Sequence, residues 1–274
     1  MTQSSEAFEK EIAAKRRYAF GKNWARFLEI LDPERASAAE RSLVAMLNLE
    51  RLDERTFLDI GSGSGLFSLA ARRLGASVTS FDFDPDSVQC AQNLKERFYP
   101  AENGWTITRG SVLDRAFMQS LSRYDIVYSW GVLHHTGRMH DAIEMAMDRV
   151  SPGGLLFIAL YRKTWLCPFW RLEKRLYVSS PPWMQAALRA AYQETVGVAY
   201  RLTHHGEPIK RGMDYERDVD DWLGGYPYES ITPRELKAFV ARQGFSLMKQ
   251  VIKSDGIHLI PGCDEYLFRR AAQR

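Results

Sequence analysis

The chain has 274 residues, of which 45% are hydrophobic and 26% are charged, a balance typical of a folded globular protein rather than a disordered one. Its formal net charge of +3 is too small to indicate a surface for binding a nucleic acid duplex, which requires a clustered basic face. Three scattered cysteines without a CxxC pair, and the lack of an apolar run long enough for a signal peptide or membrane span, lead us to expect a cytoplasmic protein.

The N-terminal part of the chain predicts a helical lead-in. Residues 5–31 have helical spacing, and residues 33–49 predict a second helix that begins with a proline. Two interpretations of the lead-in stay open. It packs on the core as a lid, or it forms one wall of a substrate cavity with Tyr18 and Trp24 facing inward, which requires a bend at Gly21.

Short apolar strands then alternate with helices. The strands are expected at 57–60, 77–81, 105–108, 125–129 and 155–161, and the helices at 64–74, 85–98, 115–122 and 139–150. The sequence Pro152-Gly-Gly154 predicts a turn before the last of these strands. Because the strands are short and apolar and helices connect them, the pattern indicates a parallel sheet covered on both faces.

The alternation is interrupted by a segment rich in Trp, Tyr, Arg and Pro. From this segment onward the predicted elements are helices at 169–178, 182–202 and 233–242, followed by antiparallel strands at 246–253 and 265–270. The third helix has a strong start signal, since Thr232 precedes a proline. We therefore expect a lead-in (1–50), a core (51–161 and 231–274) and an insertion (162–230) over the carboxyl ends of the strands.

The most informative stretch is LDIGSGSG at 58–65, in which a strand runs into a glycine-rich turn. Glycine adopts positive φ readily and lets a ligand approach the backbone closely. The next strand delivers Asp82 about 20 residues further on, where a carboxylate can accept hydrogen bonds from ribose hydroxyls. This half-unit therefore predicts a site for a nucleoside-type ligand.

Five segments in this order resemble the class I S-adenosylmethionine-dependent methyltransferases. They are LDIGSGSG at 58–65, SFDFDPDS at 80–87, GSVLD at 110–114, YSWGVLHHTG at 128–137 and VSPGGLLFIALY at 150–161. The resemblance covers residues 55–161 and 231–271. It implies a Rossmann-like α/β fold with a seven-stranded, mostly parallel sheet whose last strand is antiparallel. It also implies S-adenosyl-L-methionine as the methyl donor, with S-adenosyl-L-homocysteine (SAH) as product.

The donor site implied by the resemblance comprises Asp59, Gly61, Ser62, Gly63, Gly65, Asp82, Phe83, Ser111, Val112, Trp130 and Gly131. The G-x-G-x-G spacing differs from the G-x-G-x-x-G loop that holds a pyrophosphate, and an acid near the turn suits a cationic amino acid portion. Asp82 is the expected ribose partner and Asp84 the alternative; otherwise Asp84 and Asp86 are solvated acids, or Asp84 starts the next helix. Asp114 either reaches the adenine amine or caps the following helix.

The two histidines after the fourth strand are the candidates for proton transfer. In related small-molecule methyltransferases with a similar Leu-x-His ending the last histidine can act as base, which here is His135, with His134, Tyr228 and Glu229 as further candidates. The alternative is a histidine that holds the loop through a backbone hydrogen bond. The histidine pair and His140 lack ligands at matching spacing, so we expect no metal.

The insertion is expected to determine the acceptor. Its basic residues are Arg162, Lys163, Arg171, Lys174, Arg175, Lys210 and Arg211, and an arginine among them would neutralise an anionic acceptor. The expected acceptor-binding residues are Tyr18, Trp24, Tyr161, Arg162, Arg211 and Tyr226. The alternative for most of these residues is a solvated face beside a packed aromatic cluster.

The expected function is methyl transfer to an oxygen or nitrogen of a small or medium-sized metabolite. An RNA or protein methyltransferase is the first alternative. The lack of an Asn/Asp-Pro-Pro-aromatic run after the fourth strand and of a basic RNA-binding module argues against it. A catalytically silent protein that binds the donor is the second alternative, and an NAD-linked oxidoreductase is the third. Acceptor identity and oligomeric state are left open.

Overall fold

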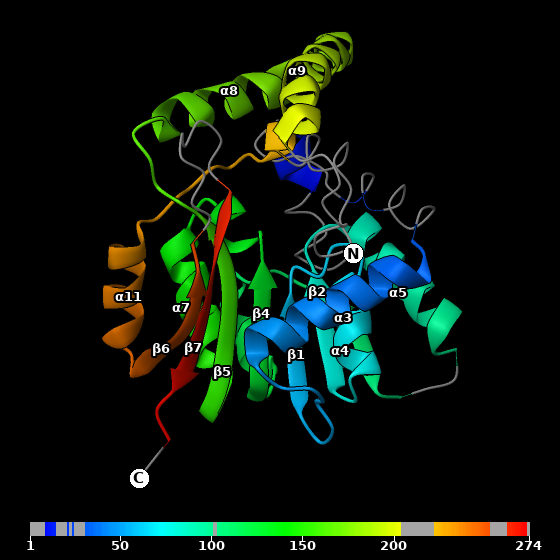
Figure 1. Ribbon diagram of the computed structural model, residues 1–274, viewed down its shortest axis with the longest axis vertical. Helices are drawn as coiled ribbons and strands as arrows, with labels where there is room; N and C mark the ends of the chain where they lie inside the picture. The colour runs from blue at the N-terminus through cyan, green and yellow to red at the C-terminus, as the bar shows by residue number, and fades with distance from the viewer. Residues whose placement is uncertain are drawn as a thin grey trace.

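The computed structural model describes residues 9–14, 21, 24, 31–100, 103–203, 222–252 and 262–272, with backbone alone for 195–203. A seven-stranded sheet forms its centre, in the order β3-β2-β1-β4-β5-β7-β6 (Figure 1). β7 runs antiparallel to both of its neighbours, and the other neighbouring pairs are parallel. The predicted Rossmann-like α/β fold with an antiparallel last strand is confirmed.

The strands lie close to their predicted positions. They are β1 (Thr56–Ile60), β2 (Ser77–Asp82), β3 (Trp105–Arg109), β4 (Tyr124–Trp130), β5 (Val150–Tyr161), β6 (Phe245–Val251) and β7 (Cys263–Arg270). The described helices that flank them are α3 (Pro33–Leu47), α4 (Leu66–Arg73), α5 (Pro85–Phe98), α6 (Arg115–Ser120), α7 (Met139–Asp148) and α11 (Pro233–Ala241). The start signal of α11 is a complete capping box, in which Thr232 and Glu235 bond to each other's backbone N–H.

The turn predicted at Pro152-Gly-Gly154 is wrong as a boundary, because β5 already begins at Val150. Tyr124 pairs with Val150 and Ile126 with Leu155, so two steps along β4 match five along β5 and three residues bulge out. Proline and glycine are tolerated within a sheet at such a bulge, where the ladder is interrupted. A hydrophobic pattern alone does not distinguish this bulge from a turn.

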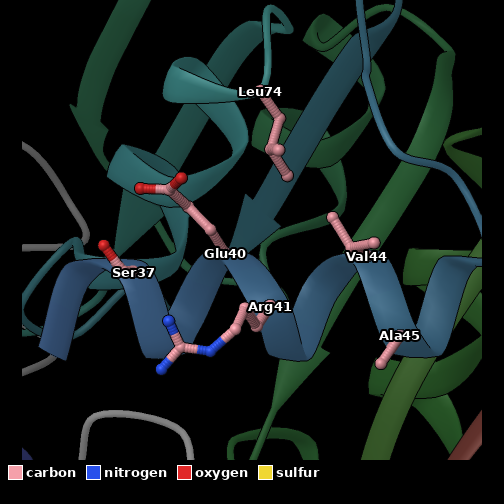
Figure 2. A pocket seen from close by; sticks show the side chains of 6 residues that line it. All are labelled: Ser37, Glu40, Arg41, Val44, Ala45 and Leu74. Carbon is pink, nitrogen blue, oxygen red and sulfur yellow. The ribbon is translucent and has the colours of Figure 1, made fainter. Parts of the chain in front are cut away.

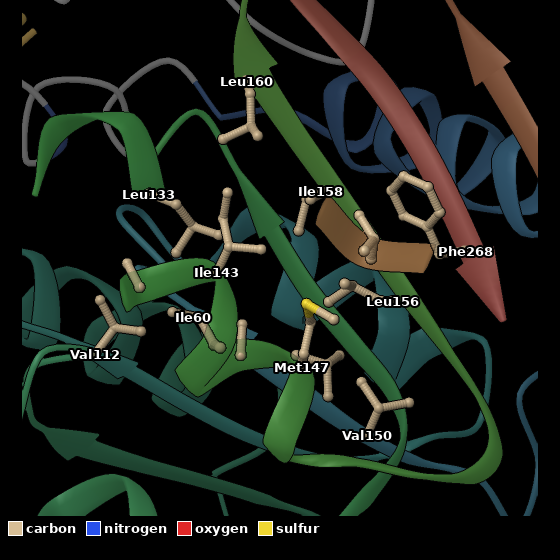
Figure 3. Packing of buried hydrophobic residues seen from close by; sticks show 14 of the residues in the cluster. Ile60, Val112, Leu133, Ile143, Met147, Val150, Leu156, Ile158, Leu160 and Phe268 are labelled. Atoms are coloured by element: carbon tan, nitrogen blue, oxygen red, sulfur yellow. The ribbon is translucent and has the colours of Figure 1, made fainter. Parts of the chain in front are cut away.

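Two apolar clusters cover the two faces of the sheet. Phe57 and Leu58 are successive residues of β1, so their side chains point to opposite faces. Phe57 packs beneath α3, α4 and α5. Leu58 packs on the other face with Ile143 and Met147 of α7 and with Leu156 of β5, as part of the cluster in Figure 3. Burial on both faces holds β1 in the middle of the sheet, with the glycine turn at its carboxyl end.

A surface hollow of about 410 Å³ lies between α3 and α4. Figure 2 shows its lining, which is Ser37, Glu40, Arg41, Val44, Ala45 and Leu74. An ion pair of 2.9 Å between Arg73 and Glu40 already joins the two helices there. Leu74 follows the C-terminal end of α4, whereas the glycine turn precedes that helix. The hollow is therefore remote from the edge where the sequence predicts a ligand.

Two further helices, α8 (Cys167–Ser179) and α9 (Pro182–Thr203), lie beyond the carboxyl ends of β4 and β5 (Figure 1). The chain leaves the sheet at Tyr161 and returns beside it, because Ile231 N–H donates to the Tyr161 carbonyl at 3.1 Å. Lys163 N–H in turn donates to the Ile231 carbonyl at 3.0 Å. Arg162 donates through Nε to buried Asp264 of β7 at 2.8 Å. These bonds fix the point from which the helical segment projects.

Candidate active site

The glycine turn after β1 brings three parts of the chain together. Gly61, Gly63 and Gly65 have φ of 73°, 53° and 81°, the left-handed region in which other residues are strained. Gly61 N–H donates to the Phe81 carbonyl of β2 at 2.9 Å. A Cβ on Gly61 would clash with Val132, in the loop after β4. The turn thus sits at the switch point between β1 and β4, where open α/β sheets bind ligands.

Asp82 organises this turn as well as the start of α5. One carboxylate oxygen accepts from Gly63 N–H and the other from Asp84 N–H, both at 2.9 Å. Burial raises the pKa of Asp82 to about 6. Each carboxylate oxygen has a second lone pair, so the group can still accept hydrogen bonds from ligand hydroxyls.

Asp84 has a structural role. It is buried, and its carboxylate accepts from Gly21 N–H at 2.8 Å and from Asp86 N–H at 2.9 Å as the N-cap of α5. The expectation of a solvated Asp84 is wrong, and its alternative role at the helix start is confirmed. Because Asp84 is buried whereas Asp82 is partly exposed, Asp82 is the stronger candidate for an acid that binds a ligand.

Asp59 lies on the face of β1 that α4 covers. Its carboxylate accepts from the Ser68 hydroxyl at 2.6 Å. Burial raises the pKa of Asp59 to about 7, while the bond from Ser68 opposes this shift. A buried carboxylate of this kind is stabilised by a nearby positive charge.

Asp59 predicts a pH dependence of stability in the ligand-free protein. Its folded pKa of about 7 exceeds the ordinary 3.8, so the folded state binds more protons between these values than the unfolded state does. Its contribution to stability is therefore fully present below pH 3.8 and is lost as the pH rises to about 7. In Asp59→Asn the free energy of unfolding should fall less steeply as the pH rises, by up to about 1.4 kcal/mol per pH unit. Urea unfolding between about pH 5 and about pH 7 measures this slope.

Asp148 provides the control, because it is an exposed acid at the end of α7. Asp148→Asn should keep the slope of the parent protein. The same slope in the parent and the Asp59 variant would contradict the prediction.

The segment after β3 lies beside Asp82. Gly110 N–H donates to the Asp82 carbonyl at 3.0 Å. Val112 is buried, and the Ser111 hydroxyl accepts from Leu113 N–H at 3.2 Å. Asp114 accepts from Phe117 N–H at 3.1 Å and is the N-cap of α6. The capping alternative for Asp114 is confirmed, whereas the contacts of Ser111 and Val112 with adenine stay a prediction.

Gly131 follows β4 and faces open space within the described structure. Its φ is 74°, and a Cβ there would meet no described atom within 4 Å. Its N–H donates to the Ala159 carbonyl of β5 at 3.2 Å. The neighbouring Trp130 donates through Nε1 to Glu265 of β7 at 3.1 Å. Gly131 therefore leaves room beside the glycine turn that a side chain would fill.

The two histidines lie in a short 3-10 helix, η1 (Leu133–His135), directly after this loop. His135 Nδ1 is 2.8 Å from the Pro227 carbonyl. Because a carbonyl only accepts hydrogen bonds, Nδ1 carries the proton in the neutral ring and Nε2 is the basic nitrogen. His134 is fully buried, and burial holds its pKa well below the ordinary value, so this ring stays neutral. Its ring centroid lies 4.2 Å from that of His135.

Tyr228 and Glu229 both have structural partners. Tyr228 is buried with its hydroxyl 3.4 Å from Cys167 Sγ, and burial raises the pKa of Tyr228, so it does not supply a base near neutral pH. Glu229 accepts from Met139 N–H at 3.0 Å at the start of α7, and burial raises the pKa of its carboxyl group. Their part in proton transfer stays a prediction, and the geometry favours His135 over both.

The structure does not bring all of the expected acceptor-binding residues together. Tyr161 stacks on Tyr228 with centroids 5.3 Å apart, and Tyr226 packs against the same cluster. The guanidinium of Arg162 is turned toward buried Asp264. A Cβ on Gly63 would lie 2.9 Å from Trp24, so this indole packs on the glycine turn rather than under α8. Tyr18 and Arg211 lie outside the described residues.

Reasoning from the sequence misses the burial of Lys174 and Trp222. Both are buried, whereas the sequence presents Lys174 only as one of several basic residues of the insertion. Helical spacing places Trp170, Lys174, Tyr177 and Val178 on one face of α8. Phe169, Leu172 and Leu176 form a second apolar stripe on the same helix, so spacing alone does not signal the burial of Lys174. Across the part of the chain that the structure describes, no three His, Cys, Asp or Glu side chains gather as metal ligands.

Comparison with known proteins identifies the family to which this chain belongs. A family model described as a methyltransferase domain matches residues 12–250. The chain belongs to this methyltransferase family. The resemblance carried by the five motifs is thereby confirmed. Among the helices that the structure describes, none is long and apolar enough to cross a membrane.

Curated relatives include several ubiquinone biosynthesis O-methyltransferases. The protein of Methylobacterium nodulans is 33% identical over 114 residues, which is 41% of this chain and 43% of that relative, so the match spans less than half of its length. The protein of Brucella anthropi is 26% identical over 232 residues, covering 82% of this chain and 75% of the relative.

Solved structures share the fold at low identity. Magnesium protoporphyrin IX methyltransferase from Synechocystis PCC 6803 with bound SAH has a TM-score of 0.56 at 14% identity, over 91% of this chain and 94% of that one. An S-adenosylmethionine-dependent methyltransferase from Mesorhizobium loti has a TM-score of 0.52 at 18% identity, over 85% and 98%.

Proposed function

We propose that this protein transfers a methyl group from S-adenosylmethionine to an oxygen or nitrogen atom of a small or medium-sized metabolite in the cytoplasm. The observation that carries the proposal is the meeting of the glycine turn, Asp82 and Gly131 at the carboxyl edge of the sheet. The O-methyltransferases among the relatives support a small-molecule acceptor and an oxygen nucleophile. None of the three cysteines forms a disulfide, which fits a reducing compartment.

The residues at this edge fit the donor. Asp82 offers carboxylate lone pairs to ribose hydroxyls, and the glycine turn lets the backbone approach the ligand closely. The open space at Gly131 provides room for the amino acid portion of the donor, and the positive charge of that portion would stabilise the ionised form of buried Asp59 if it lay nearby. When bound, S-adenosylmethionine supplies a methyl group that is already activated on a positively charged sulfur.

Because the methyl group is activated, this chain has mainly to align the acceptor and exclude water. His135 accepts a proton at Nε2 when the acceptor arrives protonated, while its Nδ1–H bond to the Pro227 carbonyl holds the ring in place. Val132 packs on Gly61, which ties the loop carrying the histidine to the donor turn.

Substitution of Gly131 tests the donor site. Gly131→Ala places a methyl group in the open space beside the turn and should weaken SAH binding about tenfold or more. Gly244→Ala is the matched control, since Gly244 lies between α11 and β6 with φ of 78°, and a Cβ there would also meet no described atom within 4 Å. Both variants should lose about 1–2 kcal/mol of stability from strain. Calorimetry with SAH showing equal affinity in both variants would contradict the assignment.

The acceptor class is tested by incubating the protein with radiolabelled S-adenosylmethionine and a cell extract. Label in the small-molecule fraction supports the proposal. Label confined to RNA or protein would instead support the first alternative, and SAH binding without transfer of label would support the catalytically silent protein. A mass measurement of the labelled product identifies the acceptor and the methylated atom.

A further inference from the structure

Two described residues of the N-terminal part of the chain, Gly21 and Trp24, pack on the half of the molecule that carries the glycine turn. Gly21 is buried, and its N–H donates to the Asp84 carboxylate at 2.8 Å. A Cβ at this position would lie 2.7 Å from both Asp84 Oδ1 and the backbone nitrogen of Ser87, and it would clash with Asp86. Only glycine permits this close approach to the start of α5.

Trp24 lies on the glycine turn itself. A Cβ on Gly63 would lie 2.9 Å from Cε2 and 3.0 Å from Nε1 of the Trp24 indole. Gly63 N–H donates at 2.9 Å to Asp82, the residue expected to bind the ribose. The indole therefore borders the place where the ribose hydroxyls are expected.

Asp82 connects these two contacts. Its carboxylate accepts from Gly63 N–H and from Asp84 N–H, each at 2.9 Å. The two donors belong to the same two residues against which Trp24 and Gly21 pack. Each of the N-terminal residues is therefore separated from Asp82 by a single residue of the donor site.

Part of the Trp24 indole is packed and part is accessible. Trp24 is half-buried and packs against the apolar cluster that contains Phe57 of β1. Asp82 is also partly exposed. A nucleoside suits this pair of groups, because its base stacks on aromatic rings and its ribose hydroxyls donate hydrogen bonds to a carboxylate. The position of Trp24 beside Asp82 thus fits the nucleoside portion of a ligand.

We propose that Trp24 contacts the nucleoside portion of the bound donor, and that the fit of Gly21 against α5 positions Trp24 for this contact. The proposal rests on the donor site of the proposed function. The indole would also keep water from the hydrogen bonds between Asp82 and the ribose, and bonds to a charged acceptor are stronger in dry surroundings. This role places Trp24 at the donor instead of at the acceptor, as expected from the sequence.

Fluorine NMR observes the contact directly. The chain has seven tryptophans, and labelling with 5-fluorotryptophan gives a resonance for each. The resonance missing from Trp24→Phe is that of Trp24, and the one missing from Trp183→Phe belongs to Trp183, which is 69% exposed on α9. SAH should shift the Trp24 resonance and leave the Trp183 resonance in place. Methylthioadenosine, which has the nucleoside but lacks the amino acid portion, should also shift the Trp24 resonance.

Affinity tests the energetic part of the proposal. Trp24→Ala should weaken SAH binding about tenfold or more, whereas Trp24→Phe keeps a flat ring and should stay within about threefold of the parent. Trp183→Ala is the matched control and should bind SAH like the parent. Calorimetry measures these affinities, and thermal unfolding shows that each variant is folded at the temperature used. Trp24→Leu, which also lacks a ring, replaces the alanine variant if that variant does not fold.

Gly21→Ala separates positioning from direct contact. Its Cβ does not fit against α5, so the variant should displace Trp24 and weaken SAH binding about as much as Trp24→Ala does. Because both changes remove the same contact, the double variant should bind no more weakly than the single variant with the larger loss. Gly104→Ala is the control and should bind SAH like the parent. Gly104 precedes β3, and the atoms nearest to a Cβ there belong to the flexible side chain of Arg72.

Three outcomes are distinguishable. A Trp24 resonance that SAH leaves unshifted, or parent-like affinity in Trp24→Ala, would overturn the assignment of Trp24. Additive losses in the double variant would overturn the role of Gly21, because they would show that Gly21→Ala acts through α5 and not through Trp24. A parent protein that does not bind SAH would instead contradict the proposed function.

Discussion

Replacing Asp82 with alanine should weaken SAH binding about 100-fold or more. A partly buried carboxylate such as that of Asp82, accepting hydrogen bonds from two ribose hydroxyls, contributes about 1.5–3 kcal/mol per bond. The substitution also removes the acceptor for Gly63 N–H, which helps to hold the glycine turn. Calorimetry with SAH measures the loss, and thermal unfolding separates it from damage to the fold.

Two further variants make the Asp82 result specific. Asp82→Asn keeps one acceptor oxygen and should lose less affinity than the alanine variant. Asp86→Ala removes an acid from the first turn of α5 and should leave the affinity unchanged. The affinity of the parent should fall below about pH 6, because protonation of Asp82 then removes acceptor capacity. Parent-like binding by Asp82→Ala would remove the basis for the donor site.

Replacing His135 with glutamine should lower kcat about 100- to 10,000-fold for an acceptor that arrives protonated. Glutamine is a polar side chain of similar size that can donate a hydrogen bond, but it has no basic nitrogen for the proton of the acceptor. SAH affinity should be retained, because His135 is assigned to the acceptor side. Single-turnover kinetics with the acceptor identified by labelling measure the effect.

The pH dependence distinguishes a base from a residue that only positions the loop. Raising the pH ionises the acceptor itself, so the deficit of His135→Gln should shrink toward alkaline pH. His140→Gln is the control, since His140 packs edge-on against Phe239 between α7 and α11. A deficit that is equal at every pH would show that His135 acts by holding the loop.

The sheet could be predicted because short stretches of sequence determine its strands and the starts of its helices. Each of the signals used extends over only a few residues. They are the short apolar strands between helices, the glycine turn, and the helix start signals at Asp84 and Thr232. The sequence does not distinguish the bulge in β5 from a turn, because proline and glycine occur in both. A local pattern does not reveal the burial of Asp84, because its partner, Gly21 N–H, lies 63 residues away in the chain.

The glycine turn and the helical segment after β5 differ in the same way. Glycine and aspartate at fixed spacing indicate a nucleoside site from the sequence alone. Lys174 becomes informative only when Trp222 and Tyr228 are brought over it from a distant part of the chain. Periodicity alone would place Phe169, Leu172 and Leu176 of α8 inside, which is the opposite of what the structure shows. Prediction from sequence is therefore weakest for the side chains that pack beneath α8.

The chain leaves the sheet at Tyr161 and returns beside it at Ile231, so the two ends of the helical segment are adjacent. This arrangement affects how related proteins could evolve different helical segments on the same sheet. Because the two backbones hydrogen-bond to each other, one contiguous piece of gene could be exchanged for another of different length with both junctions kept. The entropy of closing such a loop grows slowly with its length, so a longer or shorter replacement costs little stability. Chimeras joined at this point would test whether new acceptors can be acquired while the donor half stays unaltered.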